Sequence, residues 1–275
     1  MSIQEKAMLV QLTIKQWTNK KQDKKVTAEV ETAHGAHNAG RFNKDLVDKA
    51  LLVPHTKLIS AIRERHYALT LAWSDNGQRL LPSKLFMDYT TYIRKAKVDF
   101  TKLTTDFVNN YPAAVQAARQ RLGTMYDPDD YPDVSEMSTR FDLAVDFSPI
   151  PAANDFRVEV NAEDAEEIRS SITQSVHAKQ EAAVKATFAR VREVVSKIYE
   201  RLSIPDAIFK DTLITNAEDL CTVLNGLNIT NDPLITQLEH DMRTQLIEPP
   251  EALRRNPALR GRVAHAAQEI MQRIP

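Results

Sequence analysis

Hydrophobic residues recur along most of this chain with the period of an α-helix. After Ser83 they lie alternately three and four residues apart, which is a heptad seam of about three heptads. Its members are Phe86, Tyr89, Ile93, Ala96, Phe100, Leu103 and Phe107. Ser83 after Pro82 is suited to an N-cap, Pro112 predicts a break or kink, and Gly123 predicts the end of the helical stretch.

A second long helix is predicted from near Asn161 to just before Pro205. Its first turns hold four carboxylates that complement the helix dipole: Glu163, Asp164, Glu166 and Glu167. Its apolar stripe consists of Ile168, Ile172, Val176, Val184, Phe188, Val191, Val195, Ile198 and Leu202. The stripe steps by four at first and by four and three later, so the seam contains a stutter. A helix of about 40 residues is roughly 60 Å long, more than a compact domain requires.

Three short segments alternate apolar and polar residues, as half-buried strands do. They cover residues 8–17, 141–147 and 156–160, and the last two are joined by the proline-rich loop SPIPAAND. One small antiparallel sheet is the economical interpretation, with the N-terminal strand returning to the middle of the chain.

These elements predict a mainly α fold with a small antiparallel β-sheet (α+β). The two long helices flank the strand hairpin, so they are expected to form an antiparallel helical hairpin. Shorter helices are predicted over residues 44–73, 205–224, 233–247 and 257–274. The expected organisation is residues 1–203 for the N-terminal strand, long helices and sheet, and 204–275 for a C-terminal helical region.

The composition favours an ordinary soluble globular protein. The 275 residues are 43% hydrophobic and 27% charged, with a formal net charge of -1, which excludes a globally basic nucleic-acid binder. A single cysteine, Cys221, excludes a disulfide framework within the chain. The first residues lack the apolar core of a signal peptide, and no apolar run approaches the about 20 residues that span a bilayer. A cytoplasmic location without membrane contact is expected.

A basic strip near the N-terminus is the first candidate binding site. An aromatic residue among lysines is suited to bind single-stranded nucleic acid, because the ring can stack on a base and the lysines can contact phosphates. The strip consists of Lys15, Trp17, Lys20, Lys21, Lys24 and Lys25, with Arg41 and Lys44 further along. The alternative is a solvated turn and helix start, with Trp17 packed on the core.

The remaining polar clusters predict no catalytic, metal or cofactor site. His34 and His37 lie three residues apart in a glycine-containing segment but lack further ligands, so a polar loop is favoured over a metal site. The acidic loop YDPDDYPD lacks the EF-hand spacing. Asp142 and Asp146 are interpreted as residues on the exposed face of an alternating strand. Cys221, in an apolar stretch, is expected to be a buried and unreactive thiol. His177, beside the stripe of the second long helix, is expected to be half-exposed.

The C-terminal segment is rich in arginine, which suits acidic protein surfaces or phosphate. The candidate partner-binding residues are Arg254, Arg255, Arg260 and Arg262. The alternative is a charged outer helix face.

Several runs resemble an uncharacterised family that recurs in tailed bacteriophages and related bacterial gene clusters. The resemblance is carried by LVQLTIKQWTNKKQDKKVTAEV, HYALTLAWSDNGQRLLPSKLFMDY, RLGTMYDPDDYP, VDFSPIP and DFRV, within about the first 200 residues, and it weakens in the arginine-rich tail. Members are often encoded near MoxR- or cobaltochelatase-like AAA ATPases. The resemblance implies a phage context, hence a host bacterial cytoplasm, and an AAA ATPase partner. The family has no assigned catalytic residues, so it contributes none here.

The sequence therefore predicts a non-enzymatic interaction or assembly protein whose long helices bind a partner or a second copy. The alternative is a nucleic-acid-binding accessory protein for phage replication or recombination, which would use the basic strip. An enzyme with an unrecognised site around His34, His37 and Arg41 is the third possibility.

Overall fold

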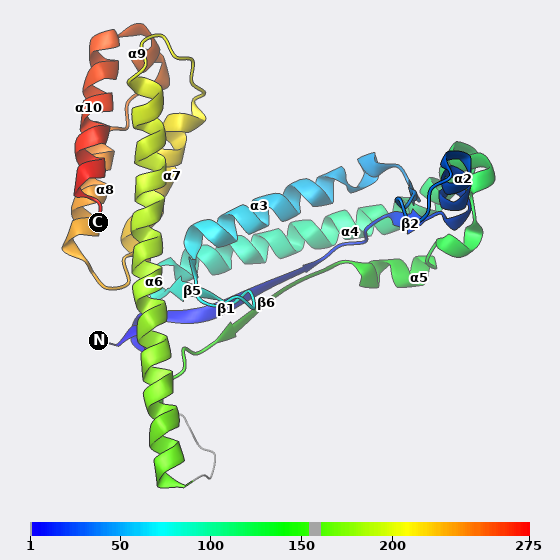
Figure 1. Ribbon diagram of the computed structural model, residues 1–275, viewed down its shortest axis with the longest axis horizontal. Coiled ribbons are helices and arrows are strands. Elements are labelled where there is room, and N and C mark those ends of the chain that lie inside the picture. Colours follow the sequence, from blue (N-terminus) through cyan, green and yellow to red (C-terminus); the bar gives the residue numbers. More distant parts are fainter. Residues whose placement is uncertain (1, 154–160) are drawn as a thin grey trace. The chain divides into compact units, whose positions relative to one another are not determined.

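Helices make up most of the computed structural model, which describes residues 2–153 and 161–275 (Figure 1). They are accompanied by a sheet of four strands in the order β4 (Leu71–Ala72), β5 (Arg79–Pro82), β1 (Ala7–Lys15) and β6 (Asp142–Ser148). β4 pairs antiparallel with β5, and β5 pairs antiparallel with β1. The predicted fold class, mainly α with a small antiparallel sheet and long helices, is confirmed. None of the helices in the described residues is both long and apolar enough to cross a membrane.

The chain divides into two compact units. Unit 1 comprises Met1–Gln11, Arg65–Thr90 and Asp146–Pro275, and unit 2 comprises Leu12–Glu64 and Thr91–Val145. The boundary between the units falls inside four elements, namely β1, α3 (Val53–Leu69), α4 (Phe86–Leu122) and β6. The predicted boundary between residues 203 and 204 lies inside unit 1.

The N-terminal strand prediction is confirmed as β1 (Ala7–Lys15), and the second predicted strand as β6 (Asp142–Ser148). The third predicted strand, 156–160, lies outside the described residues. Two strands of this sheet were not predicted: β4 (Leu71–Ala72) and β5 (Arg79–Pro82), which form a hairpin around Gly77. β5 pairs with β1 from Ala7↔Pro82 to Val10↔Arg79. This pairing helps to bury Leu9 as well as Val10, so the first half of β1 does not alternate in exposure as the sequence suggested.

Unit 2 is built on the facing parts of α3 (Val53–Leu69) and α4 (Phe86–Leu122), which lie side by side in Figure 1. His55 of α3 packs in its core against the rings of Phe100 and Phe107 of α4 and of Phe141. A two-stranded antiparallel sheet and short helices complete the unit: β2 (Lys20–Gln22), α2 (Lys24–His34), β3 (Asn43–Asp45), η1 (Lys49–Leu52), η3 (Gly123–Met125), η4 (Pro128–Asp130), α5 (Val134–Met137) and η5 (Ser138–Arg140).

Unit 1 contains a bundle of helices around the second half of α6 (Ala162–Leu202). Its other helices are α7 (Thr212–Leu227), α8 (Pro233–Gln245), α9 (Pro250–Arg255) and α10 (Pro257–Arg273), with α1 (Ile3–Lys6) and η2 (Ser83–Leu85) near the sheet. Asp232 before Pro233 and Asn256 before Pro257 cap helix N-termini, as their side chains accept from backbone N–H groups. Within the α6 stripe the residues from Phe188 to Leu202 are buried, whereas Ile168, Ile172 and Val176 are half-buried.

The first long helix differs from its prediction at two points. It begins at Phe86 after a 3-10 turn, so Ser83 does not cap it. It also continues through Pro112, which is exposed, so the predicted break does not occur there. The predicted end at Gly123 is confirmed, because α4 stops at Leu122 and Gly123 has a φ of +54°.

The packing partners of the long helices differ from the predicted antiparallel hairpin. α6 packs on α10 and α7 inside unit 1, and Figure 1 shows α6 and α10 side by side. From Thr91 onward α4 belongs to unit 2, where it packs on α3. The α4 seam therefore packs in part on α3, and the second half of the α6 stripe packs on α10 and α7.

Candidate functional site: an apolar loop braced by arginines

The segment between α6 and α7 holds the most exposed large apolar residue in the described part of the chain. Ile208 is 93% exposed, and Ile204 of the same segment is 54% exposed. A helix was predicted to start near Pro205, but α7 starts at Thr212. Asp206 instead adopts a left-handed φ of +61°, which turns the chain and presents Ile208 to solvent.

Arg260 of α10 holds this loop in place. The residue is buried, and its guanidinium group donates to the carbonyls of Arg201 and Leu202, at the end of α6. It also donates to the carbonyls of Ile204 and Ala207, at 2.8 and 3.0 Å. A single buried cation thereby satisfies carbonyls that the end of a helix leaves without intrahelical partners.

Arg254 braces the other side of the loop. Its guanidinium group donates to the Phe209 carbonyl at 3.1 Å and pairs with the Asp211 carboxylate. The guanidinium carbons of Arg254 and Arg260 lie 5.0 and 5.7 Å from the centre of the Phe209 ring. Phe209 is buried against both arginines, while Ile208, the preceding residue, is exposed to solvent.

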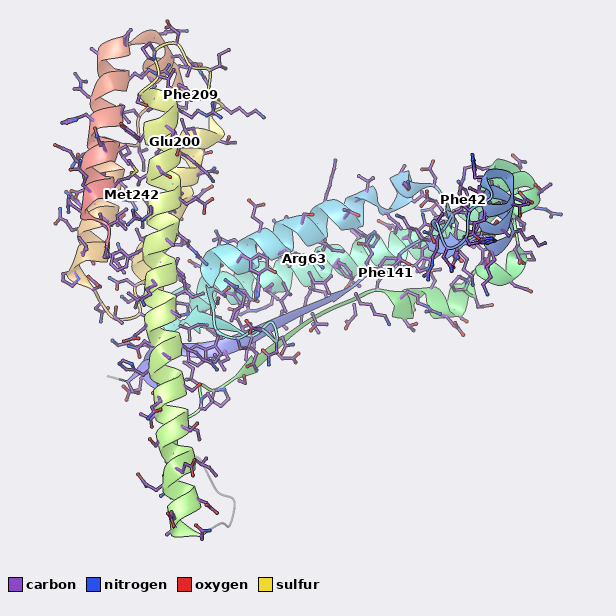
Figure 2. The ribbon with its side chains drawn as sticks, viewed as in Figure 1. Phe42, Arg63, Phe141, Glu200, Phe209 and Met242 are labelled. Atoms are coloured by element: carbon purple, nitrogen blue, oxygen red, sulfur yellow. The ribbon has the colours of Figure 1, made fainter. Side chains whose placement is uncertain are left out.

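A cavity of about 570 Å³ adjoins the loop. Its apolar wall is formed by Ile208, Phe209 and Leu213, and its polar rim by Lys197, Glu200, Arg201, Lys210, Thr212 and Asn216. Figure 2 labels Phe209 of the loop and Glu200 of the neighbouring end of α6. The loop thus presents an exposed apolar residue beside a cavity and is fixed by hydrogen bonds.

Comparison with known proteins does not identify this surface. No family model, curated protein or solved structure matches the chain. The function of the loop must therefore be inferred from its own geometry.

The four arginines predicted as partner contacts divide into two classes. Arg260 is a buried brace of the loop, whereas Arg254 bonds to the loop with a side chain that stays 40% exposed. Arg255 and Arg262 are exposed; Arg255 is 4.0 Å from Glu251, the residue one helical turn before it. Arg273 of the same tail pairs with the buried Asp241.

The residues of the predicted basic strip all lie in unit 2, and most of them are exposed. Lys20 and Lys21 form part of β2, Lys24 and Lys25 begin α2, and Arg41 lies in the following loop. Lys15 donates to the Thr139 carbonyl but stays exposed. Trp17 is half-buried and packs on Phe107 and Tyr111 of α4, so its core-packing alternative is partly correct.

Lys44 is the exception, because it is buried and internally paired. Its Nζ lies 2.8 Å from Asp130 and 3.7 Å from Asp23, and it donates to the Met125 carbonyl. A side chain that is 6% exposed has little surface for a ligand. Its assignment to the nucleic-acid strip is therefore corrected to a structural ion pair.

Most of the other polar residues singled out from the sequence are exposed. The described residues contain no group of three or more His, Cys, Asp or Glu side chains arranged to hold a metal ion. His34 and His37 are exposed, and His177 is exposed rather than half-exposed, 3.6 Å from Glu181. Asp127 and Asp133 of the acidic loop accept from backbone N–H groups.

Cys221 is buried, as predicted. Burial raises the pKa of its thiol to about 11, and the neighbouring Glu239 adds to the increase. The thiol is therefore protonated at neutral pH and is a poor nucleophile.

Two features of the site were not predicted from the sequence: the exposure of Ile208 and the turn at Asp206. Ile208 occurs in the segment PDAIFK, where an apolar residue beside Phe209 is indistinguishable from a core residue. Pro205 next to Asp206 was the available signal for a loop, because proline ends a helix and Asp tolerates the left-handed region.

Proposed function

We propose that this protein is a non-enzymatic assembly protein of phage type that self-associates through the braced loop. The observation that carries the proposal is the 93% exposure of Ile208 on a loop whose carbonyls are bound by a buried arginine. Burying an isoleucine side chain contributes about 1.5–3 kcal/mol, which the isolated chain forgoes here. A loop that is fixed in advance loses little conformational entropy when it is covered.

A second copy of the chain suits this surface. A two-fold pair brings the same patch of each copy together, so a projecting residue needs a recess on its own surface. Ile208 and the adjoining cavity provide both. The cavity rim also carries both charge signs, because Glu200 and Lys210 line it together. Each copy can thus offer a cation to the carboxylate of the other.

Light scattering coupled to size exclusion, over a series of concentrations, tests the proposal. The wild-type chain should shift from monomer to dimer as concentration rises. Ile208→Glu should stay monomeric because it places a charge at the apolar contact. Val98→Glu, at a residue of unit 2 that is 69% exposed, is the matched control and should dimerise like wild type.

Two results would contradict self-association at this surface. One is a wild-type chain that stays monomeric at every concentration, and the other is an Ile208→Glu variant that dimerises normally. We propose separately that the protein binds an AAA ATPase, as the family resemblance implies, and that both proteins are located in the bacterial cytoplasm. Co-purification of the wild-type chain and the Ile208→Glu variant with a co-expressed ATPase of that class tests it.

A further inference from the structure

A groove in unit 2 lies between the end of β1 and the start of α3. Its volume is about 620 Å³, within the range of about 300–1,000 Å³ that ligand pockets occupy. One wall is the segment from Gln16 to Lys20, and the other contains Lys49, Val53 and Lys57. Trp17 lines the groove, while Phe107 and Tyr111 contact its ring at centroid distances of 6.0 and 5.8 Å.

The base of the groove is held by Asn19, which is buried and has a left-handed φ of +57°. Its side-chain amide donates to the Val47 carbonyl and accepts from the Val47 N–H, at 2.9 and 2.8 Å. Its own carbonyl accepts from Leu46 N–H. These three bonds tie the Gln16–Lys20 wall to Leu46 and Val47, which shortly precede the residues of the other wall, and so hold the groove in shape without a ligand.

The groove is lined by three lysines and a single carboxylate. Asp45 pairs with Lys49 at 3.0 Å. Among the residues that the structure describes, neither Lys20 nor Lys57 takes part in an ion pair, and both are exposed. The exposed Lys24, Lys25 and Arg41 belong to the same unit. Unit 2 has 17 lysines and arginines against 14 acidic residues, whereas unit 1 has 19 against 23.

We propose that this groove binds single-stranded nucleic acid, with a base stacked on Trp17 and phosphates on Lys20 and Lys57. An aromatic ring in a cationic groove is how non-specific single-strand binders hold a chain. In a duplex the faces of the bases are already stacked on neighbouring base pairs, so no base face is free to stack on the Trp17 ring. The site is independent of the braced loop, which lies in unit 1.

Fluorescence anisotropy of labelled oligothymidine and oligouridine, repeated with a duplex of equal length, tests the proposal on the full chain. Binding should be tighter for the single strands than for the duplex. The double variant Lys20→Glu/Lys57→Glu should weaken single-strand binding at least tenfold. It should also reduce the salt slope by about 0.7 for each phosphate that is no longer neutralised. Both lysines are exposed, so folding should be unaffected.

Lys95→Glu/Lys97→Glu is the matched control, because it makes the same charge change on exposed residues of α4 in the same unit. This variant should lose much less affinity. Trp17→Leu should weaken binding about tenfold, as removal of one stacked base does. An absence of binding at low salt, equal losses in the two double variants, or tighter binding of the duplex would each overturn the proposal. Competition by thymidine monophosphate at equal nucleotide concentration would also overturn it, because the site would then be one for a mononucleotide.

Discussion

The guanidinium group of Arg260 lies over the ring of Phe209, 5.7 Å from its centre, while it also donates to the carbonyl of Leu202 at the end of α6. Two other helices of unit 1 end against an arginine in the same way. Arg190 of α6 donates to the carbonyls of Tyr67, Ala68 and Thr70 at the end of α3. Arg192 donates to the carbonyls of Ile274 and Pro275 beyond α10. Arginine supplies several donors in one plane and a charge that complements the helix dipole.

The first prediction concerns Arg260. Arg260→Ala should lower the free energy of unfolding of unit 1 by about 3 kcal/mol, because hydrogen bonds to a charged donor are lost and buried carbonyls are left unpaired. Arg260→Lys keeps the charge but not the planar fork, and should lose about 2 kcal/mol.

Urea denaturation followed by the fluorescence of a tryptophan in unit 1 measures the change. The chain has two tryptophans, and Trp73 lies in unit 1 while Trp17 lies in unit 2. A Trp17→Phe background therefore leaves Trp73 as the probe. Arg262→Ala, at an exposed residue of the same helix, should change stability by less than about 0.5 kcal/mol. Equal stability of the Arg260 and Arg262 variants would show that the brace contributes nothing.

The second prediction is a pH dependence that arises from His66. Its Nδ1 lies 2.8 Å from the Tyr89 hydroxyl, and both residues are buried. Burial, followed by the positive charge of Arg79, lowers the pKa of His66 from 6.5 to about 4. His66 is thus protonated near pH 6.5 in the unfolded chain but only near pH 4 in the folded chain. The stability that neutral His66 provides is complete above pH 6.5 and is lost as the pH falls toward 4, by about 1.4 kcal/mol per pH unit.

Urea titrations between pH 7 and pH 4.5, with Trp73 as the probe, measure that slope. His66→Gln should be less stable at pH 7, and its stability should fall less steeply with acidification. His265→Gln, at an exposed position of α10, should keep the wild-type slope. If His66→Gln has the same slope as wild type, other groups account for the acid sensitivity.

The long helices could be predicted because the helical spacing of their apolar residues is visible within one continuous stretch of sequence. The α4 seam repeats for several turns, and Tyr89, Ile93 and Phe100 are buried as the spacing requires. β4 and β5 could not be predicted with equal ease, because a strand of two residues such as Leu71–Ala72 has no period. The turn residues Asn76 and Gly77 were the available signal for that hairpin.

The candidate site depended on contacts between distant residues, which a pattern search does not show. Arg260 looks like a surface residue of an amphipathic helix, but the carbonyls it binds lie more than 50 residues earlier in the chain. Lys44 looked like one more cation of a basic strip, and only its approach to Asp130 shows that it is internal. Lys49 and Lys57 reach the Trp17 groove from outside the strip for the same reason.

The third prediction concerns Lys44. Lys44→Met should lower the stability of unit 2 by about 3 kcal/mol, because it leaves the carboxylates of Asp130 and Asp23 without their buried cation. Trp17 fluorescence in a Trp73→Phe background reports on unit 2. Lys20→Met removes an exposed cation and should change stability by less than about 0.5 kcal/mol. Adding Asp130→Asn to Lys44→Met should recover part of the loss, and a double variant that is less stable still would contradict the ion-pair assignment.

The fourth prediction compares two glycines of unit 1 that lie inside helices. A Cβ at Gly226 of α7 would lie 2.4 Å from Cδ2 and 2.5 Å from Cγ of Leu85, a buried residue. Gly226→Ala should therefore destabilise unit 1 by about 1–3 kcal/mol, the usual range for overpacking. A Cβ at Gly261 of α10 meets nothing within 4 Å. Gly261→Ala should stabilise the helix by about 0.5–1 kcal/mol, since alanine loses less backbone entropy than glycine on folding.

The clash at Gly226 can be isolated by a double-mutant cycle with Leu85→Ala. That single change removes the atoms that the new methyl group would meet and should itself destabilise by about 2–5 kcal/mol, because it leaves a cavity. The double variant should lose less than the sum of the two single losses, since the added methyl group fills part of the cavity. Urea denaturation with Trp73 as the probe measures the stability of the wild type, the two single variants and the double variant. Additive losses, or a neutral Gly226→Ala, would show that α7 does not approach Leu85 as closely as described.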